Sequence, residues 1–197
     1  MLAKAHITAG MAAAFSIIMP ADAETALTVV AGASLGCLVC DIDCDNPSEK
    51  SDSAHWRRVM IAVFAAALAA DHLLDGIMTR TLAESNPYIS CAGIAGFVLT
   101  CAFASISDHR GFSHSLPALA IETVFVKMAF PAAAEAFAIA FITHLILDLM
   151  NKKPVRLLYP LRKGFCLGWF YADRLANKVF AAAGSVWLIL AVIVSLR

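Results

Sequence analysis

Long apolar runs separated by short polar segments make up most of this chain. The longer runs approach the roughly 20 residues that a helix needs to cross a bilayer, whereas the first is too short to cross alone and ends at Pro20. The pattern therefore predicts an all-α fold, a polytopic transmembrane helical bundle of about six or seven apolar helices. The runs cover residues 6–19, 25–40, 59–78, 88–107, 116–130, 133–150 and 179–196.

The polar segments give the expected connections between these helices. An acidic turn containing Asp22 and Glu24 separates the first two runs, so we expect a helical hairpin that is partly re-entrant or packed against the remaining helices. Residues 41–58 are polar and are expected to form a loop. Because the chain has no internal repeat or low-complexity linker, we expect one membrane-embedded domain over residues 1–197.

Composition supports an integral membrane protein. The chain is 60% hydrophobic and 15% charged, and its net charge of +0 gives no basic field for a nucleic-acid partner. Its cysteines lie mostly within apolar runs and are expected to be reduced packing residues. Cys37, Cys40 and Cys44 could instead form a thiolate cluster, but the βαβ pattern that accompanies a redox CxxC is absent from the sequence.

The N-terminal segment has two interpretations. Lys4, the apolar run after it and Ala21-Asp22-Ala23 resemble a cleavable signal peptide, whose removal would also remove His6. The preferred interpretation is a retained helix, because His6 then falls on the same side of the membrane as the other candidate ligands described below.

The polar stretch between the runs at 88–107 and 116–130 carries the strongest chemical signal. It places two histidines, Arg110 and several hydroxyls beside apolar sequence, where ionisable groups are costly and usually functional. His109 and His114 are five residues apart, so a turn is needed to bring them together, and Gly111 permits one. Arg110 could bind an anionic phosphate oxygen or could simply lie at a lipid headgroup.

Two further pairs have spacings that suit one ion. His144 and Asp148 are four residues apart, so they share one helix face. Asp41 and Asp43 are two apart, which suits a turn that points both carboxylates at one ion or at two neighbouring ions. The alternatives are a hydrogen-bonded histidine at a helix end and a solvated acidic loop.

A count of membrane sides brings these groups together. If the chain changes side at every apolar run, the candidate ligands all fall on one side. Most Lys and Arg residues outside the runs fall on that side too, which makes it cytoplasmic by the positive-inside rule. The candidate metal ligands are His6, Asp41, Asp43, His109, His114, His144 and Asp148.

Asp71, His72 and Asp75 do not fit this site, because the same count places them deep in the third run, toward the opposite side. A structural polar contact between helices is favoured for them. A second site, or a shifted helix boundary, remains open.

These motifs resemble the family of bacterial inner-membrane, metal-dependent hydrolases described as LexA-regulated, the YdjM-like family. The resemblance rests on His6 to Gly10, on Asp41-Ile42-Asp43, on His109-Arg110-Gly111 with Ser113-His114-Ser115, on His144 to Asp148 and on Tyr159-Pro160-Leu161. One departure is Cys40, where the family usually has proline. The resemblance implies metal binding, with a distant similarity to zinc-dependent phospholipase C and P1-type nucleases.

Residues and resemblance together predict a membrane-bound metal-dependent hydrolase in the bacterial inner membrane, multi-pass, with one or two divalent ions. Zinc is the expected metal, a lipid or phosphoester the expected substrate, membrane lipids the expected partners, and a metal-activated water the expected nucleophile. Asp43 is the expected proton acceptor and Arg110 the anion holder, with His114 acting as ligand and catalytic group. The alternative is a metal-ion or proton transporter, or a non-catalytic metal-stabilised membrane protein.

Overall fold

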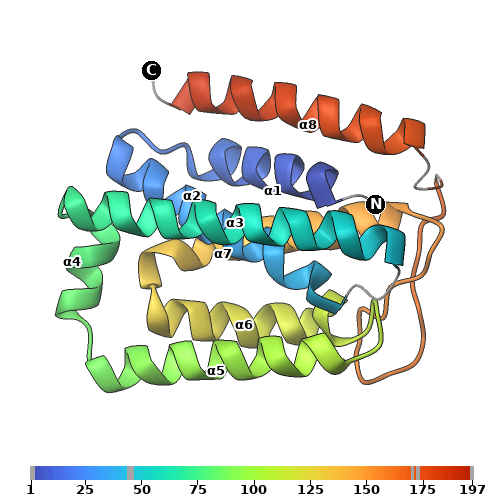
Figure 1. Ribbon diagram of the computed structural model, residues 1–197, viewed down its shortest axis with the longest axis horizontal. Coiled ribbons are helices and arrows are strands. Elements are labelled where there is room, and N and C mark those ends of the chain that lie inside the picture. The colour runs from blue at the N-terminus through green and yellow to red at the C-terminus, as the bar shows by residue number, and fades with distance from the viewer. Residues whose placement is uncertain (1–2, 44–46, 170, 172–173, 196–197) are drawn as a thin grey trace.

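The computed structural model describes residues 3–43, 47–169, 171 and 174–195, and the fold over these residues is all-α, as predicted (Figure 1). An isolated antiparallel bridge joins Val155 to Phe165 within the loop that follows the seventh helix. The helices are α1 (Ala3–Ile18), α2 (Ala23–Cys40), η1 (Asp41–Asp43), α3 (Pro47–Leu73), α4 (Ile77–Glu84), α5 (Pro87–Ile106), η2 (Phe112–His114), α6 (Leu116–Ala129), η3 (Pro131–Ala133), α7 (Ala134–Met150) and α8 (Arg174–Ser195).

Fewer helices than predicted are long enough to cross a membrane. Within the described residues four qualify by length and composition, and a fifth does if α3 and α4, bent by 76° at their junction, are counted as one broken span. The predicted count of about six or seven is not confirmed, because α1 has only 16 residues and α6 only 14. The four candidate spans are Ala23–Asp43, Pro87–Ile106, Pro131–Met150 and Leu175–Ser195.

The third run and the polar segment before it differ from the prediction. Residues 47–58 belong to α3 and are helical, although their polarity predicted a loop. The run expected to continue to residue 78 ends at Leu73, because Asp75 adopts a left-handed backbone with φ of 49° and the chain then turns into α4. A long helix that is polar in its first part and apolar afterwards, followed by a bend, replaces the single straight span.

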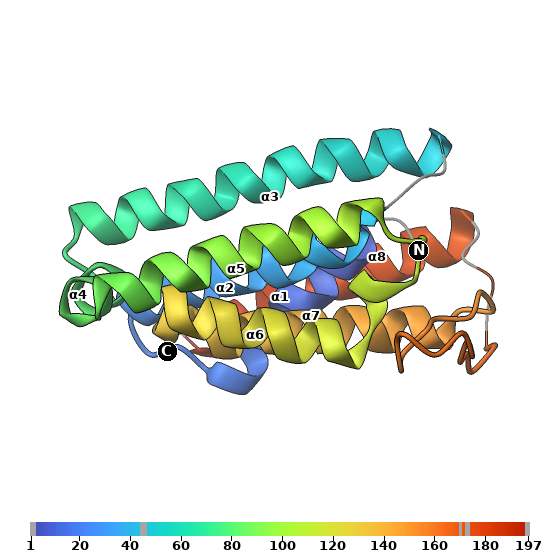
Figure 2. The same ribbon diagram turned by 90° about the horizontal axis from the view of Figure 1, so that it is seen from below.

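Helices α2 and α7 form the centre of the bundle (Figures 1 and 2). Of their spans 61% and 56% are buried, compared with 17% for α5 and 22% for α8, whose apolar side chains face outward as lipid-facing helices do. Helix α2 contacts α1, α3 and α7, and α7 also contacts α1 and α6. Helices α1, α3 and α6 thus pack on the central pair, while α8 packs mainly on α1 and α5 on α6.

Close packing between the central helices depends on small residues. A Cβ at Gly36 would lie 2.4 Å from the carbonyl oxygen of Phe137, so only glycine allows this approach. The C-terminal ends of α2 and α7, the turn η2 and the start of α1 all lie at one end of the bundle, on the right in Figure 1. The loop at residues 151–169 lies at the same end, whereas α4 lies at the other.

Candidate metal centre

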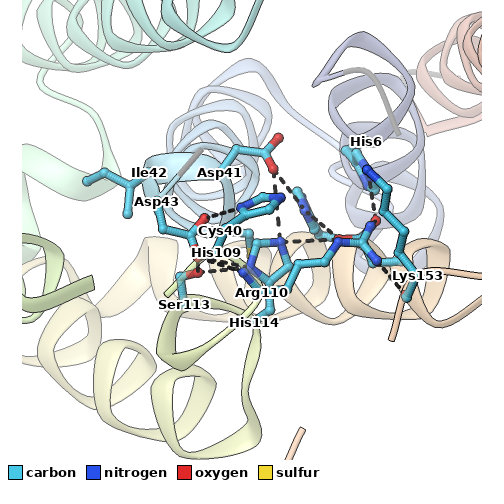
Figure 3. Close-up of polar contacts among 12 residues, drawn as sticks. His6, Cys40, Asp41, Ile42, Asp43, His109, Arg110, Ser113, His114 and Lys153 are labelled. Carbon is cyan, nitrogen blue, oxygen red and sulfur yellow. Dashed lines mark hydrogen bonds and ion pairs between the residues drawn. The ribbon is translucent and has the colours of Figure 1, made fainter. Parts of the chain in front are cut away.

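Five of the predicted ligands converge at this end of the bundle, and they come from four separate elements (Figure 3). Their side chains form two overlapping groups of possible ligand atoms, each lying within 4.8 Å, and both groups include His144. The side chain of Asp41 is 17% exposed, whereas those of the two other residues in its group, His114 and His144, are 0% exposed. The five are His6 from α1, Asp41 from η1, His114 from η2, and His144 and Asp148 from α7.

Four contacts between imidazole nitrogens and carboxylate oxygens lie near the ligand separations found around a tetrahedral ion. Nε2 of His114 lies 3.2 Å from Oδ2 of Asp148 and 4.0 Å from Oδ1 of Asp41. Nε2 of His144 lies 3.6 Å from the same Asp41 oxygen and 3.8 Å from the same Asp148 oxygen. Ligands bound to zinc at about 2.0–2.2 Å in a tetrahedron lie about 3.3–3.6 Å apart. These residues therefore fit a divalent ion.

His6 adds a third imidazole to the cluster. Its ring stacks on that of His144 with 3.8 Å between the ring centroids, and its Nε2 lies 3.5 Å from Oδ1 of Asp148. This is the second oxygen of the carboxylate, so His6 approaches Asp148 from a different direction than His114 and His144 do. The arrangement offers either a further ligand to one ion or part of a second position.

Several of the ring nitrogens are buried without a hydrogen bond. Nε2 of His114, Nδ1 of His6 and both nitrogens of His144 make none to any residue that the structure describes. Leaving a buried polar atom unpaired costs about 1–3 kcal/mol. Coordination of an ion would satisfy Nε2 of His114 and Nε2 of His144, and the donor set of imidazole and carboxylate is one that zinc accepts.

Ser113 and Asp43 hold the His114 ring from its other side. The Ser113 hydroxyl donates to Oδ2 of Asp43 at 2.6 Å, so it can accept a hydrogen bond from Nδ1–H of His114, 2.8 Å away. Asp43 Oδ2 itself lies 3.6 Å from that nitrogen. A proton held on Nδ1 makes Nε2, which faces the ligand cluster, the nitrogen that an ion can bind, as in a carboxylate–histidine–metal arrangement.

The charge state of His114 follows from the same neighbours. Burial alone would lower its pKa, but the neighbouring carboxylates of Asp148 and Asp43 outweigh burial and raise the pKa to about 10. A divalent ion that binds Nε2 must therefore displace a proton.

Asp43 lies behind this ring and is in neither ligand group. Its carboxylate is also 3.0 Å from Nδ1 of His109 and accepts a hydrogen bond from the backbone N–H of Arg110 at 3.0 Å. His109, with 28% of its side chain exposed, is likewise in neither group. Both residues were predicted as ligands, and the structure places them beside the cluster, against the segment that carries His114.

The guanidinium of Arg110 binds other residues of the protein. Its Nη2 donates to Oδ1 of Asp148 at 2.6 Å and its Nη1 to the backbone carbonyl of Lys153 at 2.6 Å. The residue is 8% exposed and has a φ of 61°, in the left-handed region. These contacts orient the Asp148 carboxylate and fasten the loop after α7. They differ from the predicted role of binding a substrate anion.

Asp71 has a structural role at the other end of the bundle. Its buried carboxylate accepts hydrogen bonds from the backbone N–H of Thr79 at 2.7 Å and of Met78 at 3.2 Å, in the first turn of α4. His72 and Asp75 are exposed. Asp71 therefore serves the structural contact that was favoured for it, at the bend between α3 and α4.

Sequence reasoning missed the role of Ser113, although its place next to His114 was a signal. It also missed Arg57, which lies beside the centre and is discussed below. Of the possible thiolate cluster, Cys37 and Cys40 are free and buried, and each thiol lies 3.9 Å from a backbone carbonyl oxygen, of His6 and Gly36. Cys44 lies outside the described residues.

Comparison with known proteins gives one clear relation. The family model described as YdjM inner membrane protein matches residues 1–197. Comparisons with curated proteins and with solved structures gave no match. The family and the apolar helices together indicate a multi-pass location in the inner membrane. Since the match covers the whole chain, the protein belongs to the YdjM inner membrane protein family.

Proposed function

We propose that this protein is a metal-dependent hydrolase that acts on a lipid or phosphoester at the cytoplasmic face of the inner membrane. The observation that carries the proposal is the buried cluster of three histidines and two aspartates at one end of the bundle. Ionisable groups at such depth are expensive, and clusters of them usually bind an ion or perform chemistry.

Zinc is the metal that the donor set favours. Two imidazole nitrogens each lie within 4.0 Å of two carboxylate oxygens, and structural or catalytic zinc sites use these donors. His6 and the second oxygen of Asp148 supply additional ligand atoms. The cluster therefore supports one ion with an expanded coordination shell or two neighbouring ions.

Asp41 is the ligand that connects the cluster to the outside. It lines a hollow of about 10 Å³, which is room for about one water molecule. When bound, a divalent ion would polarise the substrate and make such a water acidic. A carboxylate at the hollow can accept a proton from that water, so Asp41 replaces Asp43 as the proposed proton acceptor.

Asp43 and Arg110 then have positioning roles. Asp43, through Ser113, fixes the ring of His114, and Arg110 fixes the carboxylate of Asp148. Such outer contacts keep ligands in the geometry that binding requires. One carboxylate and one guanidinium thus support the centre without touching a substrate.

The distribution of charge supports a cytoplasmic centre. The end of the bundle that holds the cluster also holds most of the described cations outside the apolar helices, which the positive-inside rule assigns to the cytoplasm. They include Arg57, Arg58, Lys152, Lys153, Arg156, Arg162 and Lys163, while Arg80 and Lys127 lie toward the other end.

A screen for lipid hydrolysis tests the proposal. The detergent-purified protein, loaded with zinc, would be incubated with a bacterial lipid extract, and products would be identified by mass spectrometry. We expect a product that is absent from His144→Ala and from chelator-treated protein and that returns when zinc is restored. His72→Ala is the matched control and should remain active. Product formation by His144→Ala would contradict the proposal, and so would its complete absence in the zinc-loaded wild type.

A further inference from the structure

We propose that Arg57 binds the phosphate group of an amphiphilic substrate at the mouth of the metal centre. The inference deepens the proposed function and rests on it, since it names the chemical class that the same centre accepts. It assigns to Arg57 the anion-binding role for which sequence reasoning had selected Arg110.

The position of Arg57 is the first step. Arg57 and Asp41 line the same hollow, and they are the two charged residues among the eight that line it. Asp41 belongs to the candidate ligand cluster, so the hollow joins the guanidinium to the centre. An anionic group at this mouth can therefore face the cluster and Arg57 together.

The way in which Arg57 is held is the second step. Its Nη1 donates to the backbone carbonyl of Ile42 at 3.3 Å, and Ile42 lies between Asp41 and Asp43 in η1. This bond anchors the side chain beside the ligand-bearing turn. A guanidinium carries five N–H donors in a planar fork that matches phosphate oxygens, and one bond leaves others for a ligand. Arg110, in contrast, is directed at Asp148 and Lys153.

The other walls of the hollow indicate an amphiphile. Apart from the two charged residues, the lining is apolar or aromatic, and Trp56 is partly exposed beside Arg57. Tryptophan at such a position is typical of the boundary between membrane and water. A substrate with a phosphate next to an apolar chain would satisfy both the guanidinium and these walls, which are Ala3, Ile7, Cys37, Leu38, Trp56 and Met60.

The size of the hollow limits what can enter. At about 10 Å³ it admits a water-sized group, so the phosphate must bind at the rim beside Arg57 while the water occupies the space next to Asp41. In this arrangement the phosphorus atom at the rim and the nucleophilic water next to Asp41 would be neighbours.

Titration with phosphate tests the role of Arg57. Inorganic phosphate would be titrated into zinc-loaded wild type, Arg57→Gln, Arg57→Lys and Arg58→Gln by calorimetry, and the zinc content of each protein would be measured in parallel. Arg58 is the matched control, because it is exposed and does not line the hollow. We expect Arg57→Gln to lose phosphate affinity by about tenfold or more, Arg57→Lys to lose less, and Arg58→Gln to bind as the wild type does.

The source of the phosphate is tested with a pair of ligands. Glycerol 3-phosphate and dihexanoyl phosphatidate carry the same headgroup and differ in their acyl chains. Tighter binding of the phosphatidate than of glycerol 3-phosphate to the wild type would support a lipid. In Arg57→Gln the affinity for both ligands should then fall by the same factor. Equal affinity for the two would overturn the lipid assignment.

The remaining outcomes separate this inference from the proposed function. If all four proteins hold zinc but Arg57→Gln binds phosphate as well as the wild type, the role of Arg57 is wrong while the metal centre stands. Equal losses of phosphate affinity in Arg57→Gln and Arg58→Gln would show a general effect of positive charge and would also overturn the role of Arg57. A wild type that binds neither zinc nor phosphate would contradict both proposals.

Discussion

Oδ2 of Asp43 lies 3.6 Å from Nδ1 of His114, on the opposite side of the imidazole from the Nε2 that faces Asp148 at 3.2 Å. The carboxylate of Asp43 on one side of the ring orients it, and the carboxylate of Asp148 on the other side would bind the same ion as His114. This relation divides the two aspartates of the Asp41-Ile42-Asp43 turn into a candidate ligand and a positioning residue.

Replacement of Asp43 should weaken metal binding without abolishing it. We expect Asp43→Asn to lower zinc affinity about 10- to 100-fold, the range typical for groups that orient a metal-bound histidine. Asp41→Asn should cost more, because it replaces the anionic carboxylate of a candidate ligand with a neutral amide. Zinc titration by calorimetry checks both.

Asp22→Asn is the matched control for this comparison, since Asp22 caps the end of α2 opposite to Asp41 and asparagine caps equally well. If Asp43→Asn lost more affinity than Asp41→Asn, the two assignments would have to be exchanged.

Arg110 should matter more than Arg156, a more exposed arginine in the loop after α7. Arg110→Gln removes the 2.6 Å bond to Asp148, so we expect zinc affinity to fall about tenfold or more. Arg156→Gln breaks only the exposed pair with Asp108, and exposed pairs contribute about 0–1 kcal/mol. The same titration distinguishes them, and equal effects would show that Arg110 does not position Asp148.

The sequence was sufficient to predict most helices and the end at which the ligands gather. Alternation of sides at each apolar run placed His6, Asp41, His114, His144 and Asp148 together, and the structure does bring them together. The count works because the connections are short, so the number of reversals decides the end of the bundle at which each residue lies. It does not decide which atoms face each other.

Contacts between distant segments therefore could not be predicted. The partner of Arg110 is 38 positions away on α7, and its second acceptor is a backbone carbonyl in the following loop. The separate roles of Asp41 and Asp43 depend on the η1 turn, which a spacing of two residues does not specify. The bend after α3 was missed because residues 59–78 are apolar almost throughout.

Zinc binding should release a proton from His114. Its pKa is about 10, so at pH 7–9 the ring is protonated before the ion binds and deprotonated afterwards. The proton competes with the ion, so apparent affinity should rise with pH, by about tenfold per pH unit for one proton, and level off above the pKa.

Calorimetry in buffers of different ionisation enthalpy counts the released protons. A count of zero between pH 7 and 9 would mean that the charge of His114 is not held by Asp148 and Asp43 in the way that the geometry indicates.

Packing between α2 and α7 should control the centre from a distance. Gly36→Val would place side-chain atoms against the Phe137 carbonyl, so we expect a loss of about 1–3 kcal/mol in stability together with weaker zinc binding. The helices that carry Asp41 and His144 would be pushed apart. Ala95→Val, on the exposed face of α5, is the control and should change neither property.

Thermal unfolding in detergent and zinc titration together check this coupling. Unchanged zinc affinity in a folded Gly36→Val protein would mean that the spacing of the two helices does not determine the geometry of the cluster.

The metal content of the protein tests the proposed centre most directly. Elemental analysis would be performed on wild type, His144→Ala and His72→Ala, each purified in detergent without chelator. We predict about one or two divalent ions per wild-type chain, their loss in His144→Ala, and their retention in His72→Ala. A wild type without stoichiometric metal, or equal metal in wild type and His144→Ala, would contradict the proposed metal centre.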